Sequence, residues 1–230
     1  MRLDRFVCKS TELTKFEAIQ DIHQGNVFVN GTALTNESAQ VHENNEITLH
    51  GQALKTRRFR YIAVNKPINT VCSNVDERAY SSLFNLIDVE KVSELHVAGR
   101  LDVDTTGLVL VTDDGRWSFN IITPSKACKK VYRVGLSRAI SEDVACKFSS
   151  GIKLQGEQNL TLPAELQIIG AREVLLTITE GKFHQVKRMF KAVGNRVVAL
   201  HREKIGDICL DVEVGGWRYL SADEVESFLN

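Results

Sequence analysis

The hydrophobic positions near the start of the chain change from helical to strand spacing within a few residues. Thr14 and Glu17 form a capping box in front of an apolar stripe with helical spacing, which predicts a helix. Segments 27–29 and 46–49 then alternate apolar and polar residues, and Asn30-Gly31 supplies a tight hairpin turn. We therefore expect a compact first unit of two helices and a hairpin.

From Tyr61 onward the pattern is mostly that of strands separated by turns. Apolar or alternating segments predict strands at 61–67, 109–112, 130–136 and 172–179. The clearest helix is 184–193, with one apolar face assigned to Phe183, Val186, Phe190 and Val193 and an end at Gly194. A second capping box, Ser221 with Glu224, opens a last helix. Strands and helices together indicate an α+β chain.

A polar, basic stretch separates these two patterns. Leu54 to Arg60 reads LKTRRFR, which suits a linker between compact units. We expect a first domain at 1–56, a linker at 57–60 and a second domain at 61–230.

Composition narrows the class of protein only slightly. The 230 residues are 43% hydrophobic and 25% charged, with 29 basic and 29 acidic side chains, which is ordinary for a soluble globular protein. Five scattered cysteines without a C-x-x-C pair predict neither a disulfide framework nor a zinc ribbon. The charged N-terminus and the lack of a long apolar run predict a cytoplasmic protein without a membrane anchor.

The neutral total conceals three local concentrations of positive charge. The first contains Lys182, Lys187, Arg188, Lys191, Arg196, Arg202 and Lys204; the second contains Lys126, Lys129, Lys130 and Arg133; the third contains Arg57, Arg58, Arg60 and Lys66. Such clusters can hold the phosphates of a nucleic acid. A basic stripe on an amphipathic helix is also the ordinary solvated face of that helix, so the pattern alone leaves both interpretations open.

The candidate chemistry lies in GRLDVDTTGLVLVTDDG, residues 99–115. Asp102, Asp104 and Thr106 fit the D-x-D-x-T pattern of a Mg²⁺-dependent phosphatase, with the acidic segment 206–211 as a second element. They also fit the start of a calcium loop, although place 12 is Asp113 instead of glutamate. In a third interpretation one aspartate works without a metal, paired with a cation from the basic helix. Simple turn capping remains a fourth.

Several motifs together resemble the RsuA-type family of ribosomal RNA pseudouridine synthases over nearly the whole chain. MRLDRF with GNVFVNG resembles the S4-type RNA-binding module that precedes the catalytic domain in this family. AGRLDVDTTGLVLVTDDG, KKVYRV, and EGKFHQVKRMF with GNRVVALHREKIG are similar to its central, tyrosine and basic motifs. Lys182 and Phe183 depart from the family's arginine and tyrosine, which conserves charge and aromaticity.

The resemblance implies specific roles for the residues that match. Asp102 matches the essential aspartate, Tyr132 the aromatic residue that stacks on the flipped uracil, and Lys187 the basic partner of the aspartate. Whether Asp102 attacks as a nucleophile or removes a proton stays open. Residues expected to hold RNA are Arg100, Lys129, Lys130, Lys182, His184, Arg188 and Arg202.

The resemblance also implies the fold, the reaction and the partner. We expect an S4-like module followed by a catalytic domain with a mixed, mainly antiparallel sheet. The implied reaction flips out one uridine of small-subunit (16S) rRNA, the uridine at position 516, breaks its glycosidic bond and rejoins the base through C5, with no cofactor and no metal. The expected partner is rRNA in an assembly intermediate, bound by a monomer. The alternatives are a non-catalytic S4-type RNA-binding or assembly protein and the Mg²⁺-dependent phosphatase.

Overall fold

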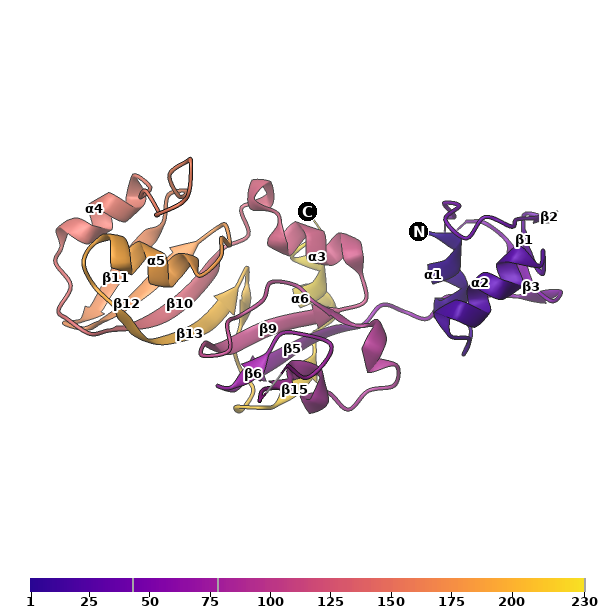
Figure 1. Cartoon of the computed structure of the whole chain (residues 1–230), viewed down its shortest axis with the longest axis horizontal. Coiled ribbons are helices and arrows are strands. Elements are labelled where there is room, and N and C mark those ends of the chain that lie inside the picture. The colour runs from indigo at the N-terminus through magenta and orange to yellow at the C-terminus, as the bar shows by residue number, and fades with distance from the viewer. Residues whose placement is uncertain (43, 78, 230) are drawn as a thin grey trace. The chain divides into compact units, whose positions relative to one another are not determined.

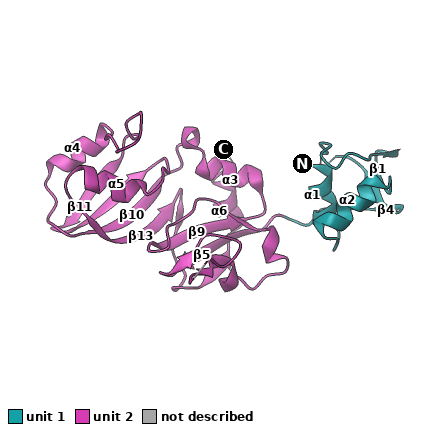
Figure 2. Cartoon of the chain, viewed as in Figure 1, with its two compact units in different colours: residues 1–58 teal, residues 59–230 magenta. Residues whose placement is uncertain are grey.

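The computed structural model divides the chain into two compact units, Met1–Arg58 and Phe59–Asn230 (Figure 2). It describes residues 1–42, 44–77 and 79–229. The division falls inside the 57–60 segment that the sequence suggests as a linker. On its two sides, Arg57 donates to the carbonyls of Lys9 and Cys8 in the first unit, and Arg60 pairs with Asp113 in the second.

The first unit packs two helices beside a small antiparallel sheet. Its elements are α1 (Leu3–Ser10), α2 (Lys15–His23), β1 (Val27–Val29), β2 (Thr32–Ala33), β3 (Ile47–Leu49) and β4 (Gln52–Ala53). The sheet order is β2-β1-β3-β4, so a second hairpin joins the expected one. The predicted capping box is confirmed, because the Thr14 side chain accepts from the Glu17 amide. Asn30 (φ 50) and Gly31 (φ 80) both adopt the left-handed conformation that a tight hairpin turn needs.

The second unit is built on a nine-stranded sheet that is mixed and mainly antiparallel, as expected (Figure 1). The main path runs β11 (Glu165–Gly170), β12 (Glu173–Ile178), β10 (Lys130–Leu136), β13 (Val197–Ile205), β9 (Thr106–Thr112), β5 (Tyr61–Lys66) and β15 (Trp217–Tyr219). β14 (Ile208–Cys209) pairs with β13, and β8 (His96–Val97) pairs with β9. In this sheet β9 and β13 are parallel, whereas the other described pairs are antiparallel. The β9–β13 pair therefore joins two antiparallel halves.

Strand β9 lies between two hydrophobic cores. Val109 and Val111 face the larger core, and Leu108 and Leu110 face a smaller one on the opposite side of the strand. Burial on both faces explains why this strand is a continuous apolar run instead of an alternating one. The strand that follows Asp102 is therefore a rigid support.

Helices cover both cores. α4 (Asp143–Ser149) and α5 (Gln185–Ala192) contribute to the larger core, and α3 (Gly115–Ile122) and α6 (Ala222–Glu226) border the smaller one. The remaining elements are η1 (Leu83–Leu86), η2 (Val92–Glu94), η3 (Pro124–Lys126), and the parallel pair β6 (Thr70–Val71) with β7 (Ser81–Ser82). Within the described ranges, no helix combines the length and apolarity that crossing a bilayer requires.

One detail of the predicted elements is wrong. Phe183 does not belong to the apolar face of α5; it precedes the helix and is 76% exposed. Beyond the end of β9, the carboxylate of Asp114 accepts from the amides of Arg116 and Trp117 and so caps α3. The predicted capping box of Ser221 and Glu224 is confirmed at the start of α6.

Candidate active site

We call the parallel pair of β9 and β13, where the two antiparallel halves of the sheet meet, the seam. It fixes the position of Asp102, which lies in the loop between β8 and β9. Along the parallel pair, Thr106 lies opposite His201 and Gly107 opposite Arg202. Gly107 has φ +105, and a Cβ there would lie 2.3 Å from the carbonyl oxygen of Arg202. Only glycine permits both this conformation and this approach of the two backbones. The Thr106 hydroxyl and His201 Nδ1, 2.8 Å apart, add a side-chain contact across the seam.

A buried lysine binds the backbone of the Asp102 loop. Lys66, at the end of β5, has no exposed surface, and its Nζ donates to the carbonyls of Thr105 (2.7 Å), Pro67 (3.0 Å) and Val103 (3.4 Å). Burial lowers the pKa of Lys66 below its ordinary value. Because its partners are backbone carbonyls, Lys66 fixes the course of the loop and leaves the Asp102 carboxylate free for another cation.

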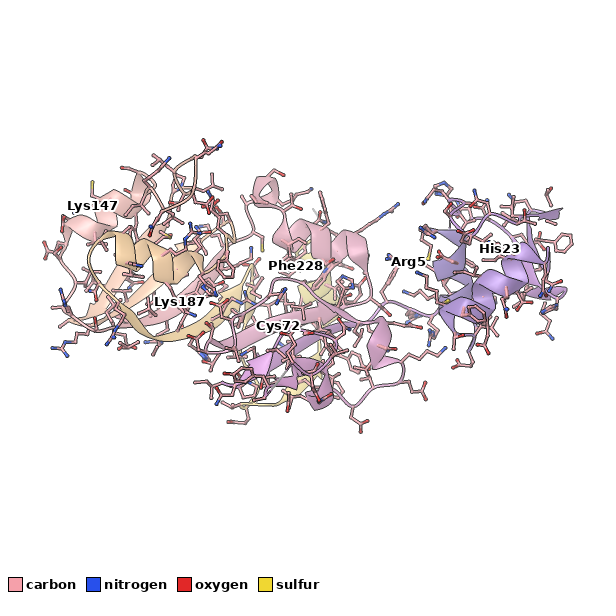
Figure 3. All side chains as sticks on the ribbon, viewed as in Figure 1. Arg5, His23, Cys72, Lys147, Lys187 and Phe228 are labelled. Atoms are coloured by element: carbon pink, nitrogen blue, oxygen red, sulfur yellow. The ribbon has the colours of Figure 1, made fainter. Side chains whose placement is uncertain are left out.

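That cation is Lys187 on α5, which is labelled in Figure 3. Its Nζ lies 2.8 Å from Asp102 Oδ2 and 2.6 Å from Asp104 Oδ1. Burial alone would lower the pKa of Lys187, but its hydrogen bonds to the two carboxylates hold that pKa above the ordinary value. Burial would likewise raise the pKa of Asp104, but the hydrogen bond and charge of Lys187 outweigh it and hold that pKa below the ordinary value. The contact therefore favours the ionised forms of Asp104 and Lys187.

His184, the residue that precedes α5, is the third side chain close to Asp102. Its Nε2 lies 3.5 Å from Asp102 Oδ1, and its backbone has φ 48, in the left-handed region that is uncommon outside glycine. The conformation ends the preceding segment and turns the chain into the helix. His184, Lys187 and Asp102, which the sequence assigned to one site, are therefore brought together.

Tyr132 is linked to the same loop through a buried arginine. Arg202 Nη1 donates to the Tyr132 hydroxyl (3.2 Å), Nη2 to the Gly99 carbonyl (2.7 Å) and Nε to the Leu108 carbonyl (2.7 Å). Arg202 is 1% exposed and Tyr132 is 7% exposed. The guanidinium thus ties the tyrosine to the loop on the N-terminal side of Asp102. Arg202 holds the site together from inside and does not face solvent as an RNA contact would.

The other predicted RNA-binding residues fall into three different environments. Lys182 Nζ and Arg188 Nη1 share Glu157 at 3.4 and 3.0 Å, so Arg188 does not pair with Asp102. Arg100 and Lys129 are exposed. Lys130 is buried, and its Nζ donates to the carbonyls of Ile121 (2.9 Å) and Cys128 (3.1 Å), so the expectation that it holds phosphate does not fit this structure.

The acidic residues do not gather as a metal site would require. Asp211 pairs with Arg218 at 2.8 Å, and Asp207 lies 4.0 Å from Lys204, so neither joins Asp102. Across residues 1–42, 44–77 and 79–229, no group of three or more His, Cys, Asp or Glu side chains could hold a metal ion. The donor geometry therefore does not support the phosphatase or calcium interpretations.

Two residues of the site were not assigned to it by sequence reasoning. Asp104 was considered for the phosphatase and calcium patterns and for turn capping, and Lys66 only as part of a basic cluster. A lysine closing a continuous apolar strand, as in YIAVNK, indicates a buried cation, because a strand buried on both faces leaves its last side chain little solvent. Asp104 carries no comparable local signal.

Comparison with known proteins places both units in described families. A model of the RNA pseudouridylate synthase family matches residues 60–192, and a model of the S4 domain matches residues 1–47. The two matched families are thus those of an RNA-modifying isomerase and of an S4 domain that precedes it. The chain belongs to the RNA pseudouridylate synthase family.

Individual relatives match the chain from end to end. Proteins named ribosomal small subunit pseudouridine synthase A are 49% identical in Vibrio parahaemolyticus and 44% in Haemophilus influenzae, each covering 100% of both chains. The protein of that name from Escherichia coli K12 is 41% identical over 99% of each chain. A solved structure titled as a crystal structure of pseudouridylate synthase is 43% identical, with a TM-score of 0.73 and 99% of each chain covered.

Proposed function

We propose that the protein converts one uridine of small-subunit rRNA to pseudouridine, acting in the cytoplasm as a monomer on an assembly intermediate. The full-length relatives named for the small ribosomal subunit support this substrate. By family resemblance the target is the uridine at position 516 of 16S rRNA. The S4 unit supplies RNA binding in addition to that of the catalytic unit.

The observation that carries the proposal is the Asp102–Lys187 ion pair at the seam of the sheet. A partly exposed carboxylate paired with an ammonium can attack the nucleoside or remove a proton from it. The bond from uracil N1 to the ribose breaks, the base turns, and a bond forms from C5 to the same ribose carbon. C5 then loses its proton to water and N1 takes up a proton, so the product is an isomer and no oxidant is consumed.

The remaining groups take their roles from their contacts, their exposure and the family resemblance. Tyr132, oriented by Arg202, supplies a π face for the flipped uracil. Lys187 balances the charge of Asp102 while the base moves. Arg100, Lys129, Lys182, Arg188 and His184 are the polar residues we assign to the RNA backbone around this site.

Release of tritium from rRNA carrying C5-tritiated uridine tests the proposal, because C5 loses its hydrogen only when the new bond forms there. We expect release by the wild-type protein on small-subunit rRNA or its assembly particles, with EDTA present. Asp102→Asn should lower the rate at least about a thousandfold.

Wild-type protein that binds these RNAs without releasing tritium would instead indicate a non-catalytic S4 protein. Release of phosphate from a generic phosphate ester that requires Mg²⁺, Asp102 and Asp104 would indicate the phosphatase. Sequencing the product for pseudouridine at position 516 tests the finer assignment separately.

A further inference from the structure

Phe183 is an aromatic side chain that the fold leaves in solvent. It is 76% exposed, and its ring stacks on His184 with 3.8 Å between centroids and 22° between planes. One face of the ring is covered by the imidazole, so an exposure this large leaves the opposite face open. A ring that contributes so little to either core stabilises the fold only weakly.

The segment around Phe183 is nevertheless held firmly. The Phe183 carbonyl accepts from Arg188 Nη1 (3.0 Å), and the Lys182 amide donates to Gln185 Oε1 (2.8 Å). Gln185 Nε2 in turn donates to buried Glu180 (2.9 Å). The backbone of residues 182–184 is thereby fixed to the first turn of α5, so the exposed ring has a defined starting point.

The stacked pair borders the reactive carboxylate. His184 Nε2 lies 3.5 Å from Asp102 Oδ1, so the ring that Phe183 covers is also the imidazole beside Asp102. Lys182, Lys187 and Arg188 lie within five residues of Phe183 in the chain. Arg188, whose Nη1 donates to the Phe183 carbonyl, places one of these cations next to the ring. An exposed aromatic ring with a cation close by is an arrangement that binds unpaired nucleotides, with charge for phosphate and the ring for the base.

We propose that Phe183 is a stacking platform for an unpaired base of the RNA immediately beside the uridine that enters the site. The inference rests on the proposed function. Extruding a uridine removes a stacking partner from its neighbour, and an aromatic side chain restores that contact whatever the base. Tyr132 cannot serve this second base as well, because the proposed function already assigns its ring to the flipped uracil. Phe183 therefore holds the RNA in the extruded conformation.

The test compares Phe183→Ala and Phe183→Trp with the wild type in single-turnover reactions on a small-subunit rRNA substrate. Phe183→Ala should raise the RNA concentration at half-maximal rate about tenfold, the size expected for loss of one base–aromatic stack. Phe183→Trp should restore wild-type behaviour, because the larger ring keeps the π face. Tyr219→Ala is the matched control, because Tyr219 is a 52% exposed aromatic residue on β15, at the edge of the sheet. Its loss should leave the RNA concentration at half-maximal rate unchanged.

A fluorescent base makes the contact visible without catalysis. With 2-aminopurine placed next to the target uridine and the inactive Asp102→Asn protein, binding should quench the fluorescence, and adding Phe183→Ala should abolish the quench. Equal half-saturation and equal quench with and without the ring would overturn the inference. Failure of the proposed function is a separate result, namely wild-type protein that forms no pseudouridine.

Discussion

The second unit contains two groups of charged residues that differ in burial and in the partners they pair with. Lys66, Lys130 and Arg202 are buried and donate mainly to backbone carbonyls. Lys187 is partly exposed and pairs with two carboxylates. A cation that holds carbonyls fixes a loop, because moving it would leave buried acceptors unpaired. A cation that holds exposed carboxylates can exchange them for substrate at little cost.

Cationic side chains in this unit therefore have two different roles: the buried ones stabilise the loops around the site, and Lys187 takes part in the reaction. Buried cations should affect folding first and activity as a consequence, whereas Lys187 and Asp102 should affect activity alone. Substitutions in the two groups therefore test this division.

Arg202→Met should produce the largest loss of stability. It leaves the carbonyls of Leu108 and Gly99 without their donor, and we expect the free energy of unfolding to fall by about 3 kcal/mol. Urea unfolding monitored by fluorescence measures it. Arg133→Met is the control, since Arg133 lies on the exposed face of β10 beside Glu173 and Glu203, and its midpoint should hardly move. Equal midpoints for both variants would contradict the role given to Arg202.

Lys66→Met should come next, with a loss of about 2 kcal/mol, because it removes a donor from three carbonyls but also relieves the burial of a charge. The rate of pseudouridine formation should fall with it as the Asp102 loop loosens. Lys129→Met, at an exposed lysine, should leave the unfolding midpoint in place. A Lys66→Met protein with wild-type rate and midpoint would show that the loop does not depend on this contact.

Asp104→Asn should act on the rate and leave stability nearly unchanged. It weakens one of the two charged hydrogen bonds of Lys187, so we expect about a tenfold slower single turnover, close to 1.4 kcal/mol. The measurement is the single-turnover rate at saturating RNA, with urea unfolding as the control for folding. An unchanged rate would return Asp104 to the role of a turn residue.

The smallest effect is the pH dependence of the Lys187 contacts. The pKa of Asp104 is lowered in the folded protein, so its contribution to stability is present above 3.8 and is lost as the pH falls below that value. The pKa of Lys187 is raised, so its contribution is present below 10.5 and is lost as the pH rises above it. Wild type and Lys187→Met should therefore differ by less than about 1 kcal/mol at neutral pH and converge at both extremes. If the difference between the two free energies of unfolding increased toward low pH, the result would contradict this account of the Lys187 contacts.

Features set by neighbouring residues could be predicted from the sequence. Both capping boxes, the Asn30-Gly31 turn and the strand through Tyr132 depend on side chains a few positions apart, and all are present. The alternation in β10 also contained an unused signal. Lys130 shares the face of Tyr132, Val134 and Leu136, so its burial follows from the period of a strand.

Features that depend on distant residues were less accessible. Lys187 and Asp104 are 83 positions apart, and which cation of the basic helix meets which aspartate depends on how α5 lies over the sheet. The exclusion of Arg188 from Asp102 likewise requires Glu157, from a loop with no pattern of its own. The family resemblance predicted catalytic roles for Asp102, Tyr132 and Lys187. It did not reveal that Lys66 holds the Asp102 loop or that Arg202 holds Tyr132.

The most direct test of the division between support and chemistry is Lys187→Met, assayed for single-turnover pseudouridine formation and urea unfolding in the same preparation. Loss of the cation beside Asp102 should lower the rate at least about a hundredfold while the unfolding midpoint stays near that of the wild type. A protein that kept its rate but lost stability would place Lys187 with Lys66 and Arg202, and would contradict the assignment of the Asp102–Lys187 pair to the reaction.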